Sequence, residues 1–177
     1  IMAITKIQSE SLNLADTYDF TGTVTGAGGA NTPAFEAYAS ATQTGIGDNV
    51  LTKMAMNTEV YDTNSKYDTS NYRFTPGVAG KYFVYGMIYM EASSGASNGN
   101  RAAIHIYKNG SSFKNAVAHY STLDDKFISV TGLVSTVMDL NDTDYVELFG
   151  QYNVFTGGVE LDGRLGNGAF GAYKIIE

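Results

Sequence analysis

The segment that most constrains this chain covers residues 81–91, because it is apolar on both faces of a strand. Successive side chains of an extended chain point to opposite faces, so odd and even positions form separate sets. Both sets are apolar here, with Phe83, Tyr85, Met87 and Tyr89 on one face and Tyr82, Val84, Ile88 and Met90 on the other. A sheet with one solvated face would alternate apolar and polar residues instead. We expect a second sheet to cover one face and an identical subunit to cover the other.

The rest of the sequence also favours strands and tight turns. The 177 residues include 20 Gly, 13 Tyr and no Trp, with frequent Val, Ile and Thr. This length is enough for one well-buried core without a metal or a disulfide. Turn signals such as Asn109-Gly110 and Asp124-Asp125 divide the chain into about ten strands, including a long one over residues 127–140. We therefore predict an all-β protein.

Three blocks of the sequence carry a family resemblance. Asp62, Tyr67, Phe74, Gly80 and Tyr82 follow the spacing of the signature of the complement C1q globular head. Residues 104–110 (Ile-His-Ile-Tyr-Lys-Asn-Gly) and 167–173 (Asn-Gly-Ala-Phe-Gly-Ala-Tyr) are also similar to that family. The match begins near Pro33 and departs from the pattern at Met56, Val84 and Gly86, where the family has aromatic residues. The resemblance implies an antiparallel jelly-roll sandwich, related to tumour necrosis factor (TNF).

The resemblance also implies a homotrimer, because the two families share a trimeric jelly roll. In such a trimer Phe83 and Tyr85 would point toward the threefold axis, while Tyr82 and Val84 would point into the sandwich. The expected subunit interface consists of Phe83, Tyr85, Met87 and Tyr173. A fold of this kind serves many roles, so it says little about function.

Residues 1–32 differ in their sequence pattern from residues 33–177, which we predict to form the jelly-roll head. Apolar residues fall on even positions from Leu12 to Val24, and a glycine-rich segment follows at residues 26–31. This pattern predicts a short N-terminal β stem and a linker, or alternatively the first strand of the jelly roll itself. Residues 23–35 are also similar to the stem-to-head junction of fibre proteins from marine tailed bacteriophages.

Charge and hydropathy exclude several classes of partner. The 18 acidic and 11 basic residues give a formal charge of −7, which disfavours nucleic acid binding. No apolar run approaches the roughly 20 residues that span a bilayer, so we expect no membrane insertion. The first residues lack the features of a secretory signal, so we expect either no Sec export or a leader missing from this sequence. The absence of Cys excludes disulfides and thiol chemistry.

Candidates for catalysis are few. The two histidines, His105 and His119, both fall inside predicted strands, where an ordinary hydrogen-bonded role is the simpler interpretation. Carboxylate pairs such as Asp124 with Asp125 fall in turns, where Asp is common for backbone reasons. We therefore expect no catalytic residues and no enzyme activity, with a carboxylate-dependent carbohydrate-active enzyme as the remote alternative.

The turn near residue 140 is the one candidate metal site. Asp139, Asp142 and Asp144 supply the oxygen donors that calcium prefers, and some relatives of this fold bind calcium near the apex of the head. The segment lacks the Gly and the closing Glu of an EF-hand. We keep calcium as an alternative to the expectation of no cofactor.

The remaining polar loops are candidates for binding. Ser94, Asn98 and Asn100 belong to a segment with nothing to bury, and Asp162 belongs to a second glycine-rich loop. A rigid β head with such loops predicts a trimeric virion protein, a phage fibre tip or capsid decoration on the particle surface, that contacts a host protein or glycan. The alternative is a cellular soluble trimeric ligand or lectin-like module.

Overall fold

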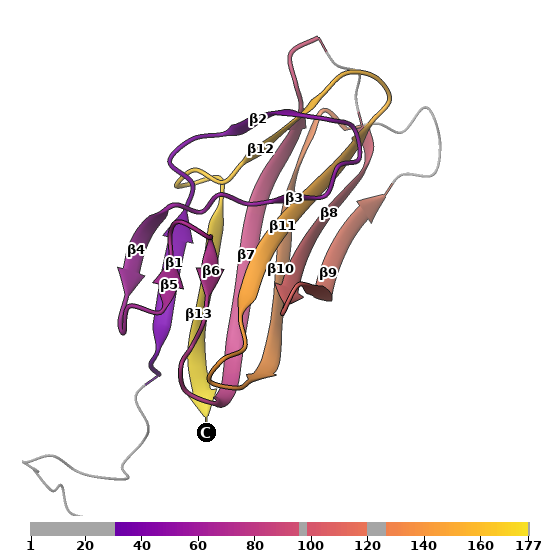
Figure 1. Ribbon diagram of the computed structural model, residues 1–177. Coiled ribbons are helices and arrows are strands. Elements are labelled where there is room, and N and C mark those ends of the chain that lie inside the picture. Colours follow the sequence, from indigo (N-terminus) through magenta and orange to yellow (C-terminus); the bar gives the residue numbers. More distant parts are fainter. Residues whose placement is uncertain (1–30, 96–98, 120–126, 177) are drawn as a thin grey trace, which may run out of the picture.

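A computed structural model describes residues 31–95, 99–119 and 127–176, which form thirteen strands in two antiparallel sheets (Figure 1). Sheet A contains β1 (Ala34–Tyr38), β2 (Gln43–Ile46), β4 (Thr58–Asp62), β7 (Gly80–Ala92), β10 (Ser129–Leu140), β12 (Val159–Asp162) and β13 (Ala169–Ile176). Sheet B contains β3 (Thr52–Lys53), β5 (Tyr67–Asp68), β6 (Arg73–Phe74), β8 (Gly99–Lys108), β9 (Ser111–His119) and β11 (Val146–Val154). The two sheets stack as a sandwich, which confirms the predicted all-β jelly roll.

The two-faced segment is β7, which lies in the middle of sheet A. β10 pairs with it from Gly80 to Glu91, and β13 and β12 share its other side. The even face points into the sandwich, where Tyr82, Val84 and Ile88 have no exposed surface. The prediction that this face is covered by a second sheet is therefore confirmed.

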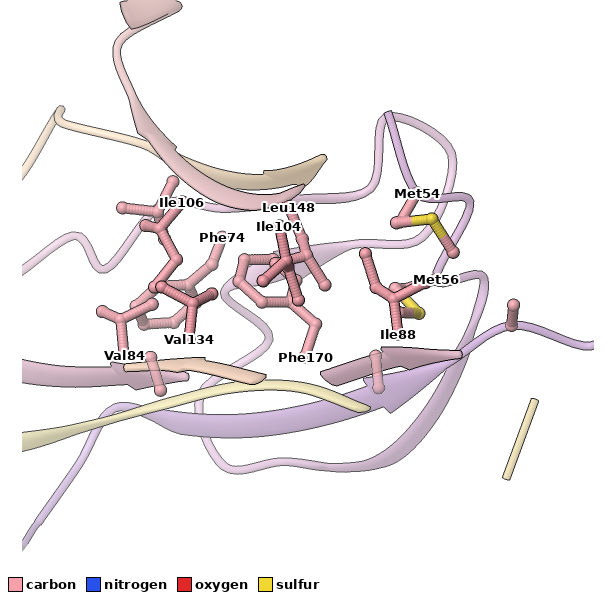
Figure 2. Packing of buried hydrophobic residues seen from close by; sticks show 14 of the residues in the cluster. Met54, Met56, Phe74, Val84, Ile88, Ile104, Ile106, Val134, Leu148 and Phe170 are labelled. Atoms are coloured by element: carbon pink, nitrogen blue, oxygen red, sulfur yellow. The ribbon is translucent and has the colours of Figure 1, made fainter. Parts of the chain in front are cut away.

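Side chains from both sheets meet in one core (Figure 2). Val84 and Ile88 of β7 face Ile104 and Ile106 of β8 across the sandwich. At the end near β1, aromatic rings replace the aliphatic residues. The ring of Phe35 stacks on Tyr67 and Phe74, with centroids 4.5 and 4.6 Å away, and meets Phe170 edge-on at 5.1 Å.

Gly86 explains one departure from the family pattern. Its backbone faces the core, and a Cβ placed there would lie 2.3 Å from Cδ1 of Leu148. Leu148 is buried and has little room to move. A glycine at this position of β7 therefore makes space for a leucine of β11, where relatives place an aromatic ring on β7 instead.

Several strand limits differ from the sequence-based expectation. The Asn109-Gly110 turn is confirmed, since its two φ angles of 51° and 76° are those of a tight hairpin turn. The strand expected over residues 127–140 begins only at Ser129, as β10, and the side chain of Ile128 before it is 64% exposed. β8 begins at Gly99. Gly99 and Arg101 already pair with β11, although the polar composition of this segment is typical of a loop.

The chain enters and leaves the sandwich at the same end. The first residues of β1 lie beside the end of β13, and the last residues of β7 and the connection from β11 to β12 lie at the opposite end (Figure 1). The predicted stem falls mainly on residues outside the described part and stays a prediction. Among the described residues, no helix is long and apolar enough to cross a membrane.

Candidate functional site

The odd face of β7 lies on the outside of sheet A and lacks the cover that its composition requires. Phe83, Tyr85 and Met87 are each only half-buried in the protomer, as is Tyr173 of β13. Phe83 lies opposite Tyr173, and their ring centroids are 5.4 Å apart. The four predicted interface residues therefore share one face, although the structure of a single chain does not test whether a subunit covers them.

β10 extends this apolar surface. Val137 lies opposite Phe83 and Leu133 lies opposite Met87. Their side chains are 52% and 64% exposed and lie on the same face as the exposed side of β7. We call the surface formed by Phe83, Tyr85, Met87, Leu133, Val137 and Tyr173 the outer patch. A contiguous apolar surface of this kind marks a contact with another molecule.

One polar pair lies at the border of the outer patch. The hydroxyl of Tyr85 donates a hydrogen bond to the Glu36 carboxylate. Burial, then the hydrogen bond and the charge of Glu36, raise the pKa of Tyr85 well above its usual value, so the phenol stays protonated. The ring of Tyr85 lies over Gly171, where a Cβ would approach its Cζ to 2.4 Å. The tyrosine is thus fixed in place before any subunit covers it.

A second apolar surface lies at the side of the sandwich, between the edge strands β9 and β10. A groove with a volume of about 190 Å³ opens there, lined mainly by aliphatic side chains and backbone. Its walls include Met90, Ala116, Ala118, Val130 and Leu133. Leu133 belongs to both the groove and the outer patch, so the two surfaces are continuous.

The three calcium candidates do not converge on a common point. Asp139 pairs with Lys81 at 2.6 Å, and Asp144 pairs with Lys108 at 2.9 Å. Within the described ranges, no group of three or more His, Asp or Glu side chains is placed to hold a metal ion. Protein cations already neutralise two of the carboxylates, and calcium binding at Asp139, Asp142 and Asp144 stays a prediction.

Asp144 has a structural role that the sequence did not indicate. Its carboxylate accepts hydrogen bonds from the side chain of Asn109 at 2.7 Å and from the backbone of Asn141 at 2.8 Å. These bonds, with the one from Lys108, lower the pKa of Asp144 to about 2. It therefore ties the β8–β9 hairpin to the β10–β11 turn.

Asp144→Asn is expected to destabilise the protein at about pH 5 but progressively less as the pH falls. The folded pKa lies below the unfolded value of 3.8, so the carboxylate stabilises the fold above about pH 4, and this contribution is lost as the pH falls toward 2. Urea unfolding of both proteins across this range would measure the effect. Asp142→Asn, at an exposed site in the same turn, is the control, and a difference between wild type and Asp144→Asn that does not change with pH would contradict this role.

The four loop residues predicted as binding candidates differ in their exposure. Ser94 is exposed in the turn after β7, whereas Asn98 lies outside the described residues. Asn100 is part of β8, and its side-chain oxygen is buried rather than displayed. The expectation that Asp162 is exposed is wrong. It is 2% exposed at the end of β12, where it accepts hydrogen bonds from Arg164 and Asn167.

Sequence analysis missed the outer face of sheet B. Glu147 of β11 is buried there and binds Lys53 and Arg73 at 2.7 and 2.9 Å. The guanidinium of Arg73 lies 3.7 Å from the centre of the Tyr145 ring. His105 also points to this face, opposite to Ile104 and Ile106, and it is 9% exposed, with its Nδ1 3.4 Å from the hydroxyl oxygen of Ser112. The signal that could have predicted this polar outer face is the alternation of polar and apolar residues in β8 and β11.

Solved structures support the fold. The globular domain of zebrafish complement 1qA has a TM-score of 0.56 at 16% identity, over 82% of this chain and 98% of that one. Murine APRIL gives 0.58 at 9% identity, over 80% of this chain and 98% of that one. Eiger TNF from S. frugiperda gives 0.56 at 10% identity, over 81% of this chain and 91% of that one. The chain therefore has the jelly-roll fold of C1q and TNF domains.

A curated relative connects the chain with phage proteins. No protein-family model matches the sequence. The phage-like element PBSX protein XkdV of Bacillus subtilis (strain 168) is 28% identical over 131 residues, which are 71% of this chain. The match spans 18% of the length of that protein. The chain is thus a C1q/TNF-like jelly roll that is similar to one part of a much longer phage-like protein.

Proposed function

We propose that this chain is a non-enzymatic, trimeric structural and binding module of a virus particle. It would form a phage fibre tip or a capsid decoration at the particle surface and contact a host receptor or glycan. The observation that carries the proposal is the outer patch, an apolar surface on sheet A that needs cover from another molecule.

The arrangement of the two apolar surfaces favours a closed ring of chains over a twofold dimer. A twofold dimer buries the same patch on both partners, whereas a ring joins one surface to a different surface of the next subunit. The protomer offers two such surfaces, the outer patch and the groove between β9 and β10. Their continuity through Leu133 allows each subunit to contact both neighbours around one axis.

The relationship to a phage-like element protein favours a virion over a cellular ligand. Both described ends of the chain lie at one end of the sandwich (Figure 1). A head attached there would display the opposite end, where Ser94 is exposed. A soluble cellular ligand, as the likeness to murine APRIL and Eiger TNF would permit, remains the second candidate.

An adsorption assay tests this function. The labelled full chain is expected to bind cells of at least one strain in a bacterial panel that includes Bacillus subtilis, and to slow infection by a phage of that host. A monomeric variant should bind far more weakly, because avidity raises apparent affinity by about 10²–10⁴-fold. An intact trimer that adsorbs to no strain would contradict the receptor-binding part of the proposal.

A further inference from the structure

The outer face of sheet B carries exposed aromatic edges next to basic groups. Tyr107 of β8 and Phe149 of β11 are both half-buried, and their ring centroids lie 4.3 Å apart with an angle of 37° between the planes. Neither ring contributes to the core between the sheets. A pair of rings on an outer sheet face offers an apolar surface on which a flat ligand can stack.

His105 lies beside this pair and has an unsatisfied polar atom. It lies opposite Phe149 on one side and Asn115 on the other. Its Nδ1 is 3.4 Å from the hydroxyl of Ser112, whereas its buried Nε2 has no hydrogen-bond partner among the described residues. Burial, and then the positive charge of Arg101, lower the pKa of His105 and favour the neutral ring. Because Nε2 has almost no solvent-accessible surface, a ligand on the sheet face would not reach it, and His105 is part of the support of this face rather than a ligand contact.

Arg101 contributes a charge that lacks a carboxylate partner in the described part of the chain. Its Nη1 donates to the neutral side-chain oxygen of Gln151 at 2.8 Å. In contrast, Lys53 and Arg73 on the same face share the carboxylate of Glu147. A guanidinium held by an amide keeps donors available for a planar anion.

We propose that the outer face of sheet B binds an acidic saccharide, in which a sugar ring stacks on Tyr107 and Phe149 and a carboxylate pairs with Arg101. The planar fork of donors on the guanidinium of Arg101 matches the carboxylate of such a sugar. This inference rests on the proposed binding function and assigns it to a sheet face rather than to the loops.

Calorimetry with two oligosaccharides tests the site on the full chain. Oligogalacturonate is expected to bind more tightly than a neutral glucose oligomer of the same length. Arg101→Gln should lower the affinity for oligogalacturonate about tenfold or more, as expected for a lost hydrogen-bonded charge, and leave the neutral oligomer unaffected. Tyr107→Ala should weaken the binding of both, because it removes one ring of the stacking surface.

Lys66→Gln is the matched control, since it removes a positive charge near Pro76 and Val78, away from this face. It should leave both affinities unchanged, and circular dichroism should show that all variants are folded. Equal binding of the two oligosaccharides, or an unchanged affinity in Arg101→Gln, would overturn the site. If neither oligosaccharide binds while the wild-type chain still adsorbs to cells, the inference fails and the proposed function stands. If adsorption also fails, both are contradicted.

Discussion

Tyr85→Asp is expected to convert the proposed trimer into folded monomers. The Tyr85 side chain is half-buried in the protomer, so a single chain can solvate an aspartate there. In the proposed trimer, three carboxylates would be buried together, and each would lie near Glu36, the present hydrogen-bond partner of Tyr85. Burying an unpaired charge costs several kcal/mol per ion, which exceeds what the interface can offset. Sedimentation velocity at micromolar concentration would measure the change, with circular dichroism as the test of folding.

Two further variants separate loss of assembly from loss of fold. Val137→Asp places a charge in the outer patch at a side chain that is 52% exposed, and it should also give monomers. Val50→Asp makes the same change at a side chain that is 49% exposed in the connection between β2 and β3, and it should remain a trimer. Tyr85→Phe removes only the hydroxyl and should also assemble. A stable Tyr85→Asp or Val137→Asp trimer would show that the outer patch is not the interface.

Phe35→Ala is expected to lower the free energy of unfolding by about 3–5 kcal/mol, the usual cost of deleting a buried phenylalanine ring. Phe35 is fully buried, and its ring contacts the rings of Tyr67, Phe74 and Phe170. The cavity left by the substitution would separate β1 of sheet A from β5 and β6 of sheet B. Chemical denaturation at one fixed protein concentration measures the loss, because assembly makes stability concentration-dependent.

Phe113→Ala provides the comparison for this variant. Phe113 is 48% exposed on β9, so the same deletion there removes little buried surface. Its effect should stay below about 1 kcal/mol, as for most exposed substitutions. Equal losses in the two variants would mean that the aromatic cluster does not hold the two sheets together.

Local patterns were enough to predict the main elements of the fold. The period of two in β7 separated its two faces, because alternation is a property of the strand itself. The family resemblance then indicated that the face with Tyr82 and Val84 lies in the core, where both are fully buried. The hairpin at Asn109-Gly110 was also predictable, since these residues tolerate positive φ angles. The family signature indicated Tyr67 and Phe74, which both pack in the aromatic cluster.

The polar contacts were not predictable in the same way, because they depend on pairing between distant segments. Glu147 meets Lys53 and Arg73 only after β3, β6 and β11 have come together in sheet B. An aspartate in a glycine-rich loop is usually solvated, yet Asp162 is buried because Arg164 and Asn167 fold back onto it. The aromatic and basic face around His105 likewise combines β8 with β11 and has no local signature.

Together, the two proposals assign different roles to the two outer sheet faces. The outer patch of sheet A would be buried at the centre of the trimer, and the outer face of sheet B would be displayed three times around it. Three weak saccharide sites on one rigid head would act together on a cell surface. Assembly would thus be a condition for effective binding.

The most direct test of this account is the mass of the wild-type chain in solution. Sedimentation equilibrium of the full chain, from low micromolar concentration upward, should give about 57 kDa, three times the 19.0 kDa of one chain. A mass of one chain over that whole range, with Phe83, Tyr85 and Val137 left exposed to water, would contradict it.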